Sequence, residues 1–97
     1  MREVVFAPAA IRHWRKLPAA ARSLLRSRIR ESLVSEDPTR TSRNRFRLRR
    51  TSPHADFELR VEPWRVFYRV AGSVVHVELI GRKSGNRLIV GGKEFEL

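Results

Sequence analysis

The segment between Asp56 and Val70 constrains the fold more than any other, because it reads as a tight β-hairpin. Two short strands are predicted, over Asp56–Val61 and Trp64–Val70, with the chain folded back at Glu62-Pro63. Side chains alternate between the faces of a strand, so the apolar members of both strands share one face. This apolar set comprises Phe57, Leu59, Val61, Val66, Tyr68 and Val70. One face of the hairpin is therefore expected to belong to the core.

Two arginines are predicted to lie close together on the other face of this hairpin. A two-residue loop pairs Arg60 with Arg65, whereas Pro63 at the first turn position would pair Glu62 with Arg65. Like charges held that close destabilise a sheet, so either register predicts an anion between the two arginines. Phosphate is the obvious candidate, because the guanidinium fork binds it through two hydrogen bonds. The alternative is that both arginines are ordinary solvent-facing strand residues.

The charge balance of the 97-residue chain favours an anionic partner. Its 21 Lys and Arg against 10 Asp and Glu give a net charge of +11, and all but three of the cations, Lys16, Lys83 and Lys93, are arginine. Arginine binds phosphates and also stacks on bases, which favours nucleic acid. An acidic protein partner would also fit this charge. A GC-rich genome would likewise raise arginine over lysine without any function.

Composition also excludes several classes of protein. The length allows one domain, residues 1–97, with a single modest core. There is no cysteine, no apolar run long enough to span a bilayer and no signal peptide, so a cytoplasmic location without membrane contact is expected. No spacing of His, Asp and Glu indicates a metal site, and no glycine-rich nucleotide loop occurs, so no cofactor is expected.

The rest of the chain completes an α+β pattern. A first strand over Arg2–Phe6 precedes two amphipathic helices, Ala9–Leu17 and Ala19–Val34, and the joint at Leu17-Pro18 predicts an antiparallel helical hairpin. Strands Val74–Ile80 and Leu88–Val90 follow the β-hairpin. The expected fold is an N-terminal strand and an α-helical hairpin packed on one face of a four-stranded, mainly antiparallel sheet. The other face is expected to stay open, and it would carry Arg60, Arg65, Arg69, His76 and Glu78.

The connection between the helices and the hairpin is the most basic part of the chain. The segment from Thr39 to Ser52 holds six arginines, and three of them alternate with Phe46 and Leu48 as in an edge strand. Such a run is either a solvated surface or a contact for RNA or for an acidic partner. The residues expected to contact RNA are Arg43, Arg45, Arg47, Arg49, Arg50, Arg69, Arg82 and Trp64, the last as a stacking platform.

The order of these elements resembles the RelE/ParE superfamily of bacterial toxins from type II toxin–antitoxin modules. The resemblance includes the opening Ala-Ile-Arg-His-Trp-Arg-Lys-Leu-Pro, the hairpin with Leu59-Arg60 and Arg65-Val66-Phe67-Tyr68, and the closing Ile80-Gly-Arg-Lys-Ser-Gly-Asn-Arg-Leu-Ile-Val-Gly-Gly-Lys-Glu-Phe95. It covers nearly the whole chain.

The resemblance implies a cytoplasmic toxin that is neutralised by a cognate antitoxin protein. RelE-like members cleave ribosome-bound mRNA without a metal, by attack of the 2′-hydroxyl on the adjacent phosphate, and so repress translation. By position, Arg65 and Arg60 correspond to arginines of the family's site, and Lys83, with Arg82 as the contender, to a second catalytic arginine. Alternatively, the chain is a ParE-like binding toxin that inhibits DNA gyrase, or a degenerate member that binds only antitoxin or RNA.

The sequence also departs from RelE at the groups that move protons. Asp56 and Glu58 occupy the positions of two lysines, and Ile89 occupies that of a tyrosine near the C-terminus. Attack by a 2′-hydroxyl needs a base, and the phosphorane needs cations. Glu58, Glu78 and His76 all project from the expected open face and could serve as the base, and Glu78 or His76 with Arg65 and Arg60 would meet these needs without a metal. The same residues could instead be surface residues that pair across strands.

Overall fold

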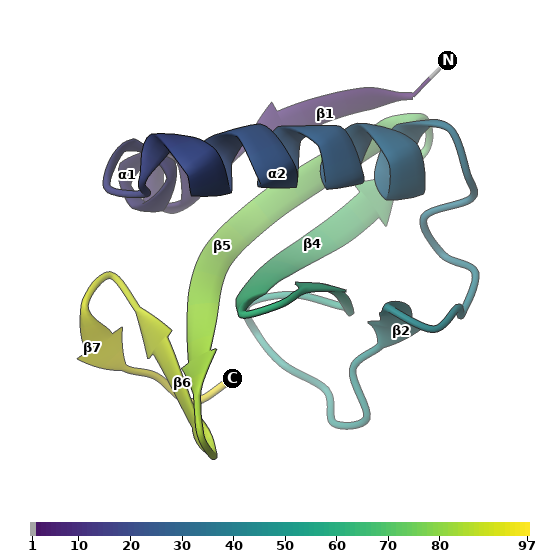
Figure 1. Cartoon of the computed structure of the whole chain (residues 1–97). Coiled ribbons are helices and arrows are strands. Elements are labelled where there is room, and N and C mark those ends of the chain that lie inside the picture. Colours follow the sequence, from purple (N-terminus) through teal and green to yellow (C-terminus); the bar gives the residue numbers. More distant parts are fainter. Residues whose placement is uncertain (1) are drawn as a thin grey trace.

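The computed structural model describes residues 2–97 and shows helices lying across one side of a strongly bent sheet (Figure 1). The elements run in the order β1 Glu3–Phe6, α1 Pro8–Arg15, α2 Ala19–Ile29, the π-helical turn η1 Arg30–Val34, β2 Arg45–Arg47, β3 Phe57–Val61, β4 Trp64–Ala71, β5 Val74–Ser84, β6 Arg87–Val90 and β7 Lys93–Glu94. The α+β class is therefore confirmed.

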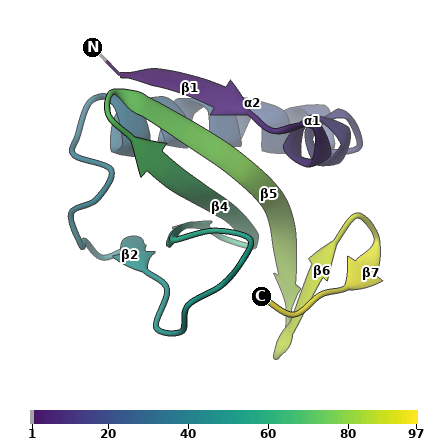
Figure 2. The same cartoon turned by 180° about the vertical axis from the view of Figure 1, so that it is seen from behind.

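The sheet has seven strands, which corrects the expected four. Strands β2 to β7 follow one another in sequence order, each antiparallel to the next, and β1 pairs in parallel with β5. The long strand β5 explains the larger number, because it serves two partners on one edge. Its beginning, Val74–Val77, pairs with β1, and its end, Gly81–Ser84, pairs with β6 (Figure 2).

The β3–β4 hairpin has the register of a two-residue loop. Val61 lies opposite Trp64, and Arg60 lies opposite Arg65. The alternative register, with Glu62 opposite Arg65, is therefore wrong. The peptide bond between Glu62 and Pro63 is cis.

The two helices do not form the expected antiparallel hairpin. Figure 1 shows α1 nearly end-on while α2 runs across the view, and Figure 2 shows the same from behind. Only Lys16, Leu17 and Pro18 separate the helices, and Pro18 has an extended backbone conformation. The chain therefore turns at an angle between α1 and α2 instead of reversing.

The main core lies between the helices and the sheet. Leu25 and Ile29 of α2 and Leu33 of η1 are buried against β3, β4 and β5. Tyr68 of β4 is fully buried in this layer, and its hydroxyl donates a hydrogen bond of 2.6 Å to the carbonyl oxygen of Pro38. Burial raises the pKa of Tyr68, so the phenol stays neutral and keeps this donor.

The opposite face of the sheet is not open, which corrects the expectation of a bare surface. A second, smaller cluster there buries Ala55, Phe67, Leu79 and Val90. The segments that cover it place Leu48, Leu88 and Phe95 against it. The cover forms because β6 and β7 fold back from the bend in β5. The sequence did not predict this path, because apolar and polar residues do not alternate clearly in so short a C-terminal segment.

Gly81 allows β6 to lie this close to β5. A Cβ atom at Gly81 would come within 2.8 Å of the Leu88 side chain and 2.9 Å of the Val90 side chain. In the described residues, neither α-helix has the length and apolar character that crossing a membrane would need.

Candidate functional site

Three of the predicted catalytic residues line one cavity on the face of the sheet away from the helices. This "arginine cavity", of about 320 Å³, is lined by Arg60 of β3, Arg65 of β4 and Lys83 of β5, together with Glu58. Three neighbouring strands therefore each contribute a cation to it. The register explains the convergence, since Arg60 lies opposite Arg65, and Arg65 lies opposite Gly81, two residues before Lys83.

A carboxylate of the protein lies between the two arginines. Oε2 of Glu58 is 3.2 Å from Nε of Arg60 and 3.3 Å from Nε of Arg65. The sequence predicted an anion at this point, and the structure places the Glu58 side chain there. Because the side chain of Glu58 is only 13% exposed, water screens these two ion pairs less than it would on an open surface.

The Arg65 guanidinium is buried and held from three directions. Besides Glu58, its Nη2 donates a hydrogen bond of 3.0 Å to Oε1 of Glu62, and its Nη1 donates one of 2.9 Å to the carbonyl oxygen of Trp64. The residue as a whole is 6% exposed. A guanidinium has five N–H groups, so two of them are left for a further acceptor. Glu62 lies in the turn, and sequence reasoning missed its contact with Arg65.

Arg60 is more exposed than Arg65 and is held by an aromatic ring. Its guanidinium carbon lies 4.7 Å from the centre of the Phe46 ring on β2, in the geometry of a cation–π contact. Nearly half of the Arg60 side chain is exposed. Arg60 is therefore oriented toward the arginine cavity while its remaining N–H groups face solvent.

Lys83 and Arg82, the two contenders of the sequence, point to opposite faces of the sheet. Successive residues of a strand alternate between its faces, and β5 puts Lys83 in the arginine cavity and Arg82 on the side of the helices. Geometry therefore favours Lys83 as the third cation of the cavity. Arg82 instead lines a second cavity beside Trp64.

His76 and Glu78 do not line the arginine cavity. His76 lies opposite Arg69 on β4 and beside Val5 on β1, away from the arginine cavity along β5. Glu78 lies at a bulge, where the register shifts between Phe67 and Tyr68. Sequence alternation placed both residues on the same face as Arg65. His76 keeps that face, because its partner Arg69 lies four residues along β4 from Arg65, and the bulge interrupts the alternation at Glu78. Of the three candidate bases, only Glu58 lies with the arginines.

The arginine-rich connection divides into exposed and structural residues. Arg43, Arg49 and Arg50 are exposed, and Arg47 is exposed with its guanidinium 4.5 Å from the centre of the Phe57 ring. Arg69 donates a hydrogen bond of 2.6 Å from Nη2 to the carbonyl oxygen of Pro53, which ties β4 to the loop before β3.

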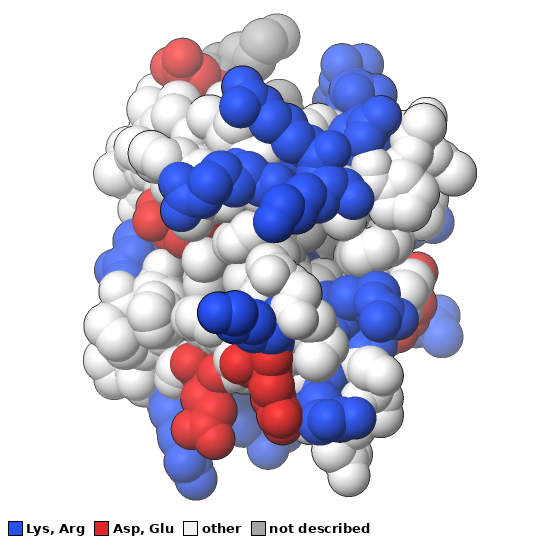
Figure 3. Space-filling view, turned by 90° about the vertical axis from the view of Figure 1, so that its left-hand side faces the viewer, with Lys and Arg blue, Asp and Glu red and all other residues white. Residues whose placement is uncertain are grey.

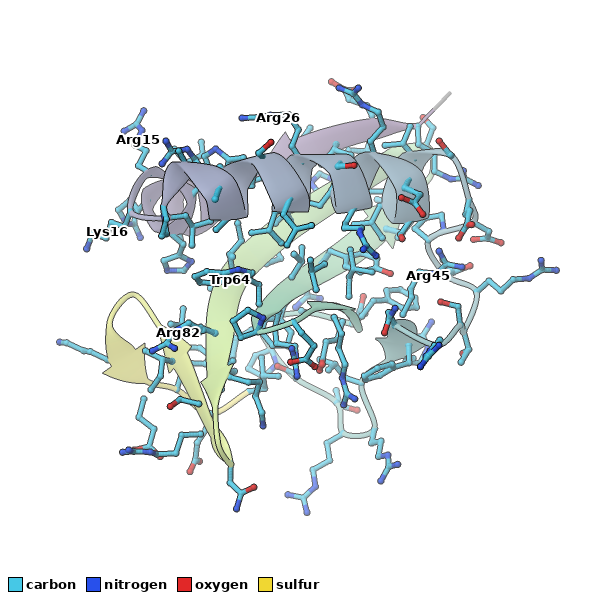
Figure 4. All side chains as sticks on the ribbon, viewed as in Figure 1. Arg15, Lys16, Arg26, Arg45, Trp64 and Arg82 are labelled. Carbon is cyan, nitrogen blue, oxygen red and sulfur yellow. The ribbon has the colours of Figure 1, made fainter. Side chains whose placement is uncertain are left out.

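Arg45 is a correction to the expected RNA-binding set, because it is only 3% exposed. Its Nε donates a hydrogen bond of 2.7 Å to the carbonyl oxygen of Arg40, and its Nη1 donates one of 2.7 Å to that of Ser32. Nη1 also lies 2.8 Å from Oε1 of Glu36. Arg45 therefore fastens β2 to the end of the helical segment (Figure 4).

The segment that ends the chain forms one wall of the arginine cavity. Glu94, Phe95, Glu96 and Leu97 all line it. The Phe95 N–H donates to the carbonyl oxygen of Leu88, which fixes this segment against β6. The two glutamates partly balance the cations of the cavity. The sequence assigned no site role to these residues, although Glu94 and Phe95 belong to the closing motif of the resemblance, because so short a segment carries no periodic signal.

A largely apolar groove with two arginines lies on the other side of the molecule, between β1 and α2. This "basic groove", of about 560 Å³, is lined by Phe6, Trp14, Arg26, Arg30 and their neighbours. The Arg26 guanidinium carbon lies 5.6 Å from the centre of the Trp14 ring. Figure 3 shows basic side chains gathered over the helices, while acidic ones lie mainly in the lower half of that view.

Comparison of the chain with models of protein families, with curated proteins and with solved structures gives no match.

Proposed function

We propose that the chain is a RelE-like toxin of a type II toxin–antitoxin module that cleaves ribosome-bound mRNA in the arginine cavity and so represses translation. The observation that carries this proposal is the position of Glu58, whose Oε2 lies within 3.3 Å of Nε of both Arg60 and Arg65. A carboxylate base flanked by cations is the set of groups that attack by a 2′-hydroxyl requires.

Each residue then has a role in the transfer. Glu58 accepts the proton of the 2′-hydroxyl, whose oxygen attacks the adjacent phosphorus. Arg65 and Lys83 stabilise the negative charge that develops on the phosphorane, and Arg60 orients the phosphate. The bond from phosphorus to the 5′-oxygen breaks, a 2′,3′-cyclic phosphate forms, and the Lys83 ammonium donates a proton to the departing 5′-oxygen.

Cleavage by this route needs only a modest rearrangement of Arg65. Two of its N–H groups are not used by Glu58, Glu62 and the Trp64 carbonyl. The scissile phosphate can accept these two donors, or it can displace Glu62, whose side chain is 73% exposed and easily released.

A binding-only toxin of ParE type, which would act on DNA gyrase, is the second candidate. The observation that favours it is that Arg65 already binds two glutamates of its own chain, while Glu94 and Glu96 line the same cavity. A cavity neutralised from within binds a phosphate more weakly than a free one. In that case the exposed arginines of the surface, and not the arginine cavity, would make the contacts with the target. A degenerate member that binds only antitoxin or RNA would have the same neutralised cavity.

The partner that neutralises the toxin is proposed to occupy the basic groove. Arg26 and Arg30 lie beside apolar walls formed by Val4, Phe6 and Ile29. An antitoxin segment with acidic residues beside apolar ones would match both features. Arg22 precedes Arg26 by the same four residues that separate Arg26 from Arg30, but it donates a hydrogen bond to the carbonyl oxygen of Leu17 and is partly engaged within the chain.

Primer extension on cellular mRNA after induction of the chain tests the proposal. Cleavage on the ribosome predicts 5′ ends that recur in phase with codons, and it predicts that Glu58→Gln abolishes them. Glu31→Gln is the matched control, because it is the same change at an exposed residue outside the arginine cavity. Growth arrest without any new mRNA ends would reject cleavage and favour the binding-only toxin.

A further inference from the structure

A third cavity lies on the helix side of the sheet, behind the arginine cavity. This "tryptophan cavity", of about 300 Å³, opens between the end of α1 and the β6–β7 turn. Its walls include His13 and Lys16 from α1, Trp64 from β4, Arg82 from β5 and the turn glycine Gly91. Figure 4 shows Lys16, Trp64 and Arg82 around this opening.

The cavity gathers positive charge without a compensating carboxylate. Lys16 and Arg82 are both exposed, and neither makes an ion pair with any residue in the described part of the chain. None of the described residues that line the cavity is acidic. In this respect it differs from the arginine cavity, whose cations face Glu58, Glu94 and Glu96. An anion therefore meets unpaired cations on the helix side, whereas Arg60 and Arg65 on the far side already bind carboxylates.

His13 adds an oriented hydrogen-bond donor to this cavity. Its Nδ1 accepts a hydrogen bond of 3.3 Å from the N–H of Ile80, at the point where β5 has left β1 and has not yet reached β6. Burial, followed by the charges of Arg12 and Lys16, lowers the pKa of His13, so the neutral ring carries its proton on Nε2.

The free edge of the imidazole faces the cavity. Nε2 makes no hydrogen bond within residues 2–97, and no side-chain nitrogen or oxygen there is both buried and unpaired. Nε2 is therefore accessible from the cavity. A Cβ atom at Gly91 would lie 3.6 Å from Nε2, so the turn reaches this edge of the ring.

The turn that closes the cavity is encoded by its two glycines. Val90 pairs with Lys93, which leaves Gly91 and Gly92 as a two-residue loop, and both have a positive φ. Such a turn strongly favours glycine at both positions and folds β7 back tightly. Because glycine has no side chain, the turn leaves space between itself and α1.

We propose that the tryptophan cavity binds a nucleotide, with its phosphate on Lys16 and Arg82 and its base against Trp64. Trp64 is half-buried and offers a flat ring at the cavity wall, and base stacking on an aromatic ring is indifferent to which base is present. The Nε2–H of His13 is a further donor for phosphate or sugar oxygen. The volume is at the lower end of ligand cavities, which fits one nucleotide unit and no more.

This site is separate from the proposed cleavage site, because Arg82 and Lys83 project from opposite faces of β5. The nucleotide could be one unit of a single-stranded RNA or a free nucleotide, since both present a phosphate beside a base. The proposal does not depend on cleavage, and its test measures only binding.

Titration of the full chain by NMR, with four probes, tests the proposal. Adenosine 5′-monophosphate should shift the amide signals of Gly81 and Gly91 and the indole N–H of Trp64, and leave the indole N–H of Trp14 unchanged. Adenosine and inorganic phosphate should each bind at least about tenfold more weakly, because each lacks one half of the contacts. A tetra-adenylate with free 5′-hydroxyl ends separates the two sources. Shifts with both ligands assign an RNA unit, and shifts with the monophosphate alone assign a free nucleotide.

Three variants locate the binding. Lys16→Ala and Arg82→Ala should each weaken binding of the monophosphate by about tenfold. Arg15→Ala removes the same charge from the same end of α1 but lies outside the cavity, so it should change affinity less than about twofold. Equal losses in all three variants would show non-specific attraction to a basic surface and would overturn the proposal. So would equal binding of phosphate and of the monophosphate, or the absence of any shift at Trp64.

Discussion

Arg60 and Arg65 lie directly opposite each other on β3 and β4, and both contact the same oxygen of Glu58. Two cations at paired positions of an antiparallel sheet would repel each other, and the shared carboxylate offsets that repulsion. The same arrangement places a carboxylate, which can accept a proton, between two guanidinium groups of the kind that can bind phosphate. Cleavage of RNA in this cavity therefore requires that the Glu58 carboxylate accept the proton of the 2′-hydroxyl when a phosphate is bound.

Glu58→Gln should abolish cleavage while the protein still folds. The amide has the same shape and still offers an oxygen to Arg65, but it cannot accept the proton of a 2′-hydroxyl, so the single-turnover rate on programmed ribosomes should fall about 10²–10⁴-fold. His76→Gln and Glu78→Gln are measured beside it. A loss of the same size in either of those variants would place the base elsewhere, and full activity of Glu58→Gln would remove it from the mechanism.

Arg65→Ala should lower the cleavage rate by about 10²–10³-fold, because it removes a donor that stabilises charge on the phosphorane. Arg65→Lys should recover little, since an ammonium lacks the fork that contacts Glu58, Glu62 and the phosphate together. The single-turnover rate of Arg65→Ala at saturating protein is compared with that of Arg49→Ala. Arg49→Ala should weaken RNA binding but leave the rate at saturation nearly unchanged. Thermal unfolding of each variant separates a catalytic loss from a folding defect.

Arg45→Ala should destabilise the fold without a specific effect on cleavage. It removes charge-assisted hydrogen bonds to the carbonyl oxygens of Ser32 and Arg40, and such bonds contribute about 1.5–3 kcal/mol each. Urea unfolding measures the change in the free energy of unfolding. Arg43→Ala, an exposed neighbour, should stay within about 0.5 kcal/mol of the parent chain. Equal stability of the two variants would contradict the structural role of Arg45.

Stability should decrease as the pH falls below neutrality, through His13. The pKa of this histidine is lowered in the folded chain from 6.5, so the unfolded chain binds more protons in that range. The free energy of unfolding is then greatest above pH 6.5 and falls as the pH drops from there toward the folded pKa. In His13→Asn this slope should flatten between pH 7.5 and 5.5. An unchanged slope in urea unfolding at the two pH values would exclude His13 as the cause.

Charge reversal in the basic groove should weaken antitoxin binding. Arg26→Glu and Arg30→Glu place like charges against an acidic segment and should raise the dissociation constant at least about tenfold each. Arg28→Glu is the matched control on the same helix, because Arg28 is exposed and lies outside the groove. If Arg28→Glu weakens the complex as much as the other two, the groove is not the docking site and only net charge matters.

The sequence by itself determined the hairpin and the closeness of its two arginines. Alternation from Phe57 to Val61 and the turn residues Glu62-Pro63 act locally, so the apolar face and the closeness of Arg60 to Arg65 follow from the periodicity of a strand. The helices and the α+β class were predictable for the same reason. The register of the two strands could be decided only from the structure, because two turns of different geometry fit the same residues.

Only the tertiary structure decided which charged groups meet. The bulge at Glu78 interrupts the alternation on which its predicted position depended. Alternation sends Lys83 and Arg82 to opposite faces, but the segments that pack on those faces decide which cavity each residue lines. Arg45 read as one more surface arginine, yet contacts with Ser32 and Arg40 bury it. Such partners lie far apart in the chain or on the far side of a turn. The contacts between them depend on how the sheet bends and where its ends are covered. The periodicity of apolar residues along the sequence does not contain that information.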